Sequence, residues 1–107
     1  MNQLIQQISA FKVRDNFPLE DWEGRGLNPS DEATRQGMNL AVIEFADFLI
    51  SQISNGVVEH DVMLEQVQNY FDERDNYEFD TEEREYIVDV QCGLARLVKV
   101  DCSDLLI

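Results

Sequence analysis

Oxygen-bearing side chains at the spacing of a calcium-binding loop occur between residues 72 and 83. Such a loop takes its ligands from carboxylates and amides at fixed positions. The matching residues at positions 1, 5, 9 and 12 are Asp72, Asn76, Asp80 and Glu83. Position 3 is Arg74 and position 6 is Tyr77, where the loop needs an oxygen ligand and a glycine. The sequence therefore predicts no calcium site.

The remaining candidates for chemistry are few. The single histidine, His60, and two cysteines ten residues apart, Cys92 and Cys102, do not make a zinc ligand set. A serine or cysteine nucleophile needs a positioned base, and His60 is the only histidine in the sequence. We therefore expect no catalytic residue, no metal, no cofactor and no enzyme activity. An enzyme would instead need a pocket that holds a carboxylate of perturbed pKa.

Charge is the property that most restricts the partners. The chain has 107 residues, a length typical of one domain spanning 1–107, and its net charge is −14, from 22 Asp and Glu against 8 Lys and Arg. A field of this sign repels phosphate backbones and anionic lipid surfaces. The partner that we expect is therefore a basic protein surface, and neither nucleic acid nor a membrane.

The acidic excess is concentrated between Glu59 and Asp89. These 31 residues hold twelve carboxylates and two arginines, which gives −10 of the net charge. We expect the charges to share one end of the folded chain, because a turn between 72 and 85 bends it back on itself. A solvated face that keeps the protein soluble is one explanation. A binding face is the other, since self-repulsion at this density lowers stability more than solubility requires.

Aromatic residues among these charges favour the binding face. Tyr70, Tyr77 and Phe79 are interspersed with carboxylates, a mixture found at the centres of protein interfaces. Alternatively, Tyr70 belongs to the core and Phe79 is a hydrophobic staple before a helix. The predicted partner-binding residues are Asp72, Glu73, Asp75, Tyr77, Glu78, Glu82 and Glu85.

Hydrophobic periodicity predicts an all-α, single-domain bundle of four main helices. The first is marked by apolar residues one turn apart, namely Leu4, Ile5, Ile8 and Phe11. Residues 15–30 contain both prolines and two glycines, and predict an ordered Gly/Pro-rich loop. The second helix, with Asn28 as N-cap and Pro29 as its first residue, runs to Asn55-Gly56. It is apolar on two faces, as expected of a central helix.

Two further helices follow. One is expected from Glu59 to Arg74. The next begins with a capping box, in which the Asp80 side chain accepts from the backbone N–H of Glu83 and the Glu83 side chain accepts from the backbone N–H of Asp80. This helix ends near Lys99. Residues 103–107 are expected to form one more turn against the core. Sustained β-branched alternation is absent from the sequence, so no strand is predicted.

The location expected from the sequence is the cytoplasm. The first eight residues contain no basic residue and no continuous apolar run, unlike a secretory signal. Glu44 and Asp47 interrupt the most apolar segment, 38–53, which argues against a membrane span. Without export, Cys92 and Cys102 are expected to be reduced thiols. The oligomeric state, monomer or homodimer, stays open.

Three short blocks resemble those of a known family. They are Gly26-Leu27-Asn28-Pro29, the seven residues from Asp80 to Tyr86, and the closing Cys102-Ser103-Asp104-Leu105-Leu106. From about Phe17 to its end the chain is similar to a bacterial family of small acidic helical proteins described as a domain of unknown function. No function comes with that resemblance. In size, acidity and helix content the chain is also similar to bacterial immunity proteins, which bind and neutralise a cognate toxin.

The function expected from these features is a cytoplasmic immunity or inhibitor protein that binds a basic toxin by charge complementarity. Opposite fields would speed association, and a buried aromatic residue such as Tyr77 would slow release. An acidic nucleic-acid mimic that blocks a DNA-binding enzyme is one alternative, and it would spread carboxylates along an extended surface. A structural or adaptor subunit is the other, and it would expose an apolar patch, with Trp22 and Leu105-Leu106-Ile107 as candidates.

Overall fold

The computed structural model describes residues 2–57, 59–74 and 78–106. All regular structure within these ranges is helical. The elements are α1 (Asn2–Val13), α2 (Leu19–Gly24), α3 (Glu32–Ser54), α4 (His60–Glu73), α5 (Thr81–Leu97) and a final 3-10 turn, η1 (Cys102–Asp104). The prediction of an all-α chain with four long helices is confirmed.

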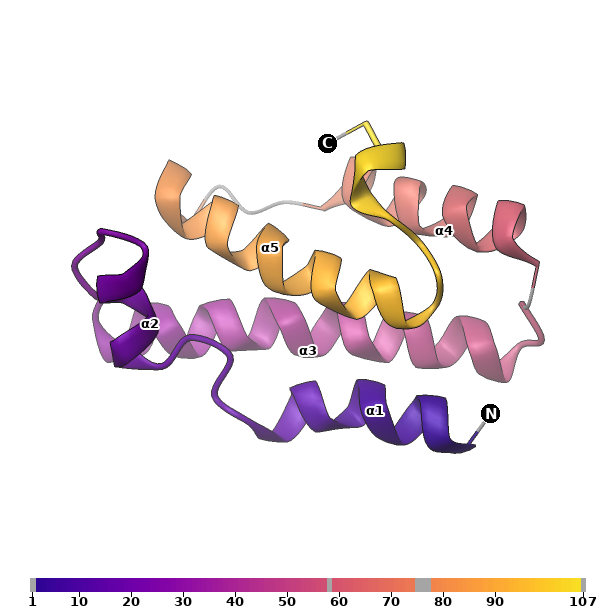
Figure 1. Cartoon of the computed structure of the whole chain (residues 1–107), viewed down its shortest axis with the longest axis horizontal. Helices are drawn as coiled ribbons and strands as arrows, with labels where there is room; N and C mark the ends of the chain where they lie inside the picture. Colours follow the sequence, from indigo (N-terminus) through magenta and orange to yellow (C-terminus); the bar gives the residue numbers. More distant parts are fainter. Residues whose placement is uncertain (1, 58, 75–77, 107) are drawn as a thin grey trace.

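The 23-residue helix α3 forms the centre of the molecule, with α1 along one side and α5 and α4 along the other (Figure 1). Its buried side chains recur every three to four residues, the spacing of one helix face. They are Met38, Val42, Phe45, Ala46, Leu49 and Ile53. The second apolar face that the sequence indicated is only partly covered. Ile43 and Ile50 are half-buried, and Leu40 is 54% exposed.

Helix α3 begins later than predicted. Its N-cap is Asp31, whose side chain accepts a hydrogen bond from the backbone N–H of Thr34 at 2.7 Å. The predicted cap, Asn28, and the following Pro29 precede the helix instead. Asn and Asp are equally good N-caps, so residue type did not distinguish the two positions.

The segment predicted to be an ordered loop contains the helix α2. Trp22 of this helix is buried, and its indole N–H donates to the Phe17 carbonyl oxygen at 3.1 Å. The rings of Phe17 and Trp22 both meet Tyr86 of α5 edge to face, at centroid distances of 4.7 and 5.2 Å. The expected aromatic anchoring is therefore present, but a loop throughout 15–30 is wrong. Six residues are too few to show a helical period in the sequence.

A polar network holds the connection between α1 and α2 against α3. Asn16 is buried; its side-chain amide donates to the Phe11 carbonyl oxygen at 2.8 Å, and its backbone N–H donates to Asn39 at 2.9 Å. Asp15 accepts hydrogen bonds from the Asn39 side chain and the Phe17 backbone N–H, both at 3.0 Å. Because these bonds favour the charged form, they lower the pKa of Asp15.

Large aromatic side chains hold α4 against α3. The Tyr70 ring centroid lies 4.9 Å from that of Phe45 and 4.8 Å from that of Phe48, and Phe71 lies 5.3 Å from Phe45. Aromatic pairs at such distances add about 0.5–1.5 kcal/mol to the energy of simple burial. The predicted helix from Glu59 to Arg74 is confirmed, with these two residues as its N-cap and C-cap.

The C-terminal segment connects α5 to α4. Leu105 is buried, and the Leu106 backbone exchanges two hydrogen bonds with the Gln68 side chain, at 2.8 and 2.9 Å. Cys92 and Cys102 form a disulfide across a Cα separation of 5.8 Å. The prediction of two reduced thiols is therefore wrong. The chain reverses after α5 and brings η1 beside that helix, which the spacing of the cysteines alone did not reveal.

Reducing the disulfide should lower the free energy of unfolding by about 3 kcal/mol, because a closed loop of roughly 11 residues restricts the unfolded chain. Urea unfolding with and without a phosphine reductant, followed by far-ultraviolet circular dichroism, measures this difference. A variant carrying Cys92→Ser and Cys102→Ser should unfold like the reduced protein and should not respond to the reductant. Equal midpoints for the oxidised and reduced protein would contradict the prediction.

Candidate functional site

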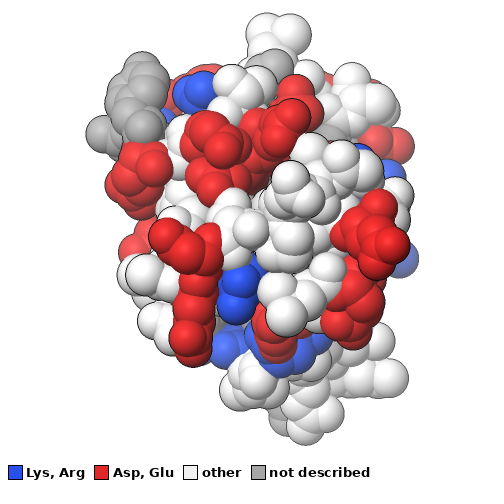
Figure 2. Space-filling model, turned by 90° about the vertical axis from the view of Figure 1, so that its left-hand side faces the viewer, with Lys and Arg blue, Asp and Glu red and all other residues white. Residues whose placement is uncertain are grey.

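Five of the seven predicted binding residues lie in the described part of the chain, and all five are exposed. Asp72 and Glu73 belong to the last turn of α4, Glu78 lies just before α5, and Glu82 and Glu85 lie in the first turns of α5. We call these five residues the acidic site; its α4 part lies near the middle of the long axis, and its α5 part lies near one end (Figure 1). Asp75 and Tyr77 lie outside the described residues. Figure 2 shows the end of the molecule where α5 begins, with carboxylates over much of its surface.

The predicted capping box fixes the start of α5. The Asp80 side chain accepts from the backbone N–H of Glu83 at 2.7 Å, and the Glu83 side chain accepts from the backbone N–H of Asp80 at 2.9 Å. The Ser30 hydroxyl also donates to the Glu83 carboxylate, which ties α5 to the segment before α3. Glu83 is 9% exposed, so this carboxylate is structural, whereas the neighbouring Glu82 is exposed.

Phe79 and Tyr70, two of the three aromatic residues considered for the binding face, belong to the core. Phe79 is buried, and a Cβ atom at Gly37 of α3 would lie 3.5 Å from its ring. Tyr70 is half-buried between α4 and α3, where burial and the nearby Glu44 raise its pKa to about 12. Of the two interpretations of these residues that the sequence left open, the one that places them on a binding face is wrong. The core role considered for Tyr70 is confirmed.

The carboxylates of the acidic site form no ion pair with any described residue. The ion pairs in the described part of the chain are Lys12 with Asp47 and Arg25 with Asp89, and the His60 ring lies 3.6 Å from the Asp61 carboxylate. Asp72 accepts a hydrogen bond from the neutral Gln68 side chain at 2.9 Å. Asp72 and Glu73 also stand at the C-terminus of α4, where the helix dipole favours cations. The C-cap Arg74 lies over the Phe71 ring at 4.6 Å and makes no salt bridge with them, although the charge of Asp72 favours its charged form.

The acidic residues do not all share one end of the molecule, contrary to the prediction. Helices α4 and α5 begin at opposite ends, so Glu59, Asp61 and Glu65 lie far from the start of α5 (Figure 1). The reason is that α4 ends near the middle of the long axis and not beside the start of α5. Asp61, Glu65 and Asp72 share one face of α4, along a rise of about 16 Å.

Three arginines from separate parts of the chain line a shallow hollow of about 480 Å³, together with Glu85 of the acidic site and Asp89. The arginines are Arg25 after α2, Arg74 after α4, and Arg84 in α5. Arg25 is held by Asp89, at 2.8 Å, and by the face of Tyr86, 4.3 Å from the ring centroid. Sequence reasoning missed Arg25 because 64 positions separate it from Asp89. Basic side chains lie among the carboxylates on this end of the molecule (Figure 2).

The features expected of other functions receive little support. The apolar patch of an adaptor does not form as proposed, because Trp22 and Leu105 are buried; Leu106 is exposed, and Ile107 lies outside the described residues. No group of three or more His, Cys, Asp or Glu in the described ranges could hold a metal ion. None of the described helices is both long and apolar enough to cross a membrane.

Truncating two glutamates should have opposite effects on stability. Glu73→Ala removes an unfavourable charge from a helix C-terminus and should raise the free energy of unfolding by about 0.5 kcal/mol. Glu83→Ala breaks the capping box and its contact with Ser30, and should lower it by about 1–2 kcal/mol. Urea unfolding at low ionic strength measures both values. Destabilisation by Glu73→Ala would show that Glu73 supports the fold.

Comparison with known proteins gives a family and no further relative. No curated protein and no solved structure shows significant similarity to the chain. The family model described as a domain of unknown function, DUF4844, matches residues 1–107, so the similarity includes α1 as well as the part from Phe17 onward. The chain therefore belongs to the DUF4844 family.

Proposed function

We propose that the chain is an inhibitor of the immunity type, which binds a basic partner protein, such as a cognate toxin, through the acidic site. The observation that most supports this proposal is the pair of unpaired carboxylates at the end of α4, Asp72 and Glu73. Their position is unfavourable in the free chain because it opposes the helix dipole. A cation from a partner placed beside them would turn that unfavourable charge into a favourable contact.

The rigidity of the acidic site also supports a binding role. Glu82 and Glu85 stand on a helix whose start is fixed by the capping box and by Ser30. The buried Phe79 anchors the chain beside Glu78. Because the backbone that carries these side chains is already in place, a partner would lose little free energy in ordering the backbone.

The arginine-lined hollow would allow the acidic site to select among basic partner proteins. A uniformly acidic surface attracts any basic protein, whereas this hollow combines three arginines with Glu85 and Asp89 and attracts cations less than the surface around it. The partner that fits is therefore basic around its contact area and carries acidic or polar groups opposite the hollow. Steering by the acidic field could bring association rates to about 10⁸ M⁻¹s⁻¹ at low salt.

We propose the cytoplasm as the place of action, where thiols are kept reduced. The disulfide between Cys92 and Cys102 would be reduced there, so the proposal requires that the reduced protein can still bind its partner. Among the described residues, Glu78, Glu82 and Glu85 make no polar contact with the C-terminal segment. Asp72 is linked to it, because Gln68 donates to Asp72 and also exchanges hydrogen bonds with Leu106. Reduction of Cys92 and Cys102 should therefore leave the three glutamates in place and affect binding only through Asp72.

A second candidate function, an acidic nucleic-acid mimic, is favoured by one specific observation. Carboxylates at Asp61, Glu65 and Asp72 follow one face of α4 towards the acidic site. A protein that blocks a DNA-binding enzyme would use such an extended row in place of a line of phosphates. The two functions differ in whether the early part of α4 contributes to binding.

The partner should be recovered by affinity capture from the native lysate at low salt and be lost at roughly 0.5 M salt, where charge interactions are screened. The inhibitor proposal expects one basic protein in a one-to-one complex, toxic when expressed alone and neutral when co-expressed with this chain. A non-toxic partner that processes DNA would support the mimic. If no protein is captured at either salt concentration, both functions are contradicted.

Charge reversal tests the site itself, once the partner is purified. Glu73→Lys, Glu78→Lys and Glu85→Lys together should weaken binding by about 100-fold, mostly through slower association and a smaller salt dependence. The matched control reverses three carboxylates at the other end of α4, in Glu59→Lys, Asp61→Lys and Glu65→Lys, and should change the affinity by less than about threefold. Equal losses would favour the mimic. Unchanged binding in the first variant would exclude the acidic site.

A further inference from the structure

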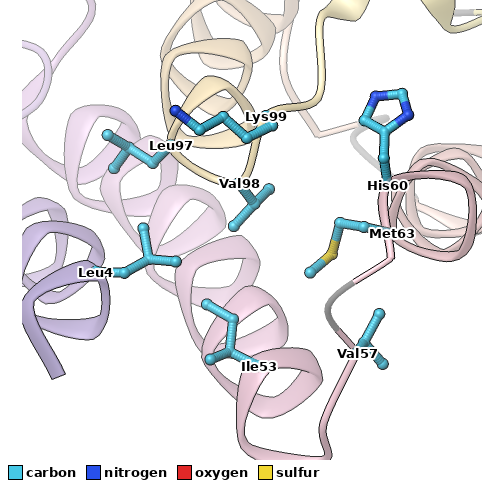
Figure 3. A pocket seen from close by; sticks show the side chains of 8 residues that line it. All are labelled: Leu4, Ile53, Val57, His60, Met63, Leu97, Val98 and Lys99. Atoms are coloured by element: carbon cyan, nitrogen blue, oxygen red, sulfur yellow. The ribbon is translucent and has the colours of Figure 1, made fainter. Parts of the chain in front are cut away.

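An apolar pocket of about 270 Å³ (Figure 3) is lined from helix ends that lie away from the start of α5 (Figure 1). It forms where the start of α1, the end of α3, the start of α4 and the end of α5 meet. The side chains that face the shared space are aliphatic or thioether groups, from Leu4, Ile53, Met63 and Val98 (Figure 3). The part of a ligand that enters this pocket must therefore be a hydrocarbon.

Two nitrogen-bearing side chains stand at the edge of the pocket. Lys99 follows the end of α5, and His60 is the first residue of α4. Both side chains are exposed; the Lys99 side chain runs along the edge towards Leu97, and the His60 ring points away from the apolar interior (Figure 3). A ligand that filled the pocket would place its polar end beside these donors. An oxyanion is the group that an ammonium at the mouth would attract.

The backbone of Lys99 supplies an independent reason to assign it a role. Three helices end with a residue in the left-handed conformation, namely Gly26 after α2, Gly56 after α3 and Lys99 after α5. Each makes the same pair of closing hydrogen bonds; after α5 they run from Lys99 N–H to the Arg96 carbonyl and from Val100 N–H to the Ala95 carbonyl, both at 3.0 Å. Glycine is the favoured residue at this position because a Cβ is strained there.

The chain thus uses glycine at two equivalent helix ends and a strained lysine at the third, beside the pocket. Backbone strain that persists without a structural benefit is characteristic of functional positions. We infer that the pocket binds a small aliphatic carboxylate, with its hydrocarbon chain among Leu4, Ile53 and Met63 and its carboxylate paired with the Lys99 ammonium. This inference does not depend on the proposed inhibitor function, because it concerns helix ends that lie away from the start of α5.

Octanoate is a suitable probe, and the methionine methyl groups report its binding by nuclear magnetic resonance. Octanoate should shift the Met63 methyl resonance and leave that of Met38, which is fully buried in the core, unchanged. Octanol should bind about threefold to fivefold more weakly, because it lacks the exposed ion pair with Lys99. Octylammonium should bind more weakly still. A Met63 resonance that does not respond to octanoate, or an equal response to octanoate and octylammonium, would overturn the inference.

Lys99→Gly separates a binding role from a structural one. The variant relieves the strained backbone, so it should raise the midpoint of thermal unfolding and yet bind octanoate about threefold to fivefold more weakly. Lys99→Gln keeps the Cβ and removes only the charge, and should lose the same affinity without gaining stability. Arg96→Gln is the matched control, because it removes a cation that belongs to the same helix but does not line the pocket. This variant should bind octanoate as tightly as the wild type. If Lys99→Gly binds octanoate like the wild type, the assigned role of Lys99 is wrong.

Discussion

The burial of one face of α3 is the constraint that places the other helices. The six buried side chains of this face, from Met38 to Ile53, have to be covered by apolar side chains of the other helices. Helices α1 and α5 pack directly along α3, and α4 is held against it through the Phe45, Phe48, Tyr70 and Phe71 rings. Because the inner face of α4 is taken up by this aromatic contact, its polar face is left to solvent. The row of carboxylates on α4 follows from that arrangement.

The acidic residues at the ends of the helices fall into two groups with different physical roles. Asp31 and Asp80 cap the starts of α3 and α5, where a negative charge and a hydrogen-bond acceptor both stabilise the helix. Glu83 is almost buried and completes the capping box. Asp72 and Glu73 stand at a helix end that disfavours them, and no described cation pairs with them. The net charge that keeps the protein soluble does not require carboxylates at this helix end, because Asp31, Asp80 and Glu83 contribute to the same net charge from favourable positions.

The features that the sequence predicted correctly are those decided by neighbouring residues. The capping box needs only Asp80 and Glu83, three positions apart, so the start of α5 was found together with the exposed Glu82 and Glu85. The hydrophobic periodicity that predicted α4 likewise depends only on residues within that helix. By contrast, the choice of Asp31 over Asn28 as N-cap depended on where the preceding segment meets the rest of the fold.

The features that the sequence missed or misassigned depend on contacts between distant residues. Phe79 and Tyr70 look the same in a sequence whether they line a core or an interface, and only the position of α3 beside them decides. The disulfide requires the reversal of the chain after α5. The pair of Arg25 and Asp89 joins α2 to α5 across 64 positions, and no spacing rule predicts it. The pocket beside Lys99 is formed by four helix ends, so no single segment indicates it.

The ends of two helices depart from the local rules that the rest of the chain follows. At α4 a helix C-terminus carries acidic side chains, and at α5 a left-handed position carries lysine although the chain has glycine at the two equivalent positions. In a sequence otherwise consistent with its fold, such departures mark positions that serve something besides folding. The two departures differ in kind. The acidic side chains at the end of α4 are electrostatically unfavourable, and a cation can remove that unfavourable energy. The left-handed backbone at Lys99 is strained, and no ligand relieves that strain. Only the lysine side chain, and not its conformation, can therefore take part in binding at the second position.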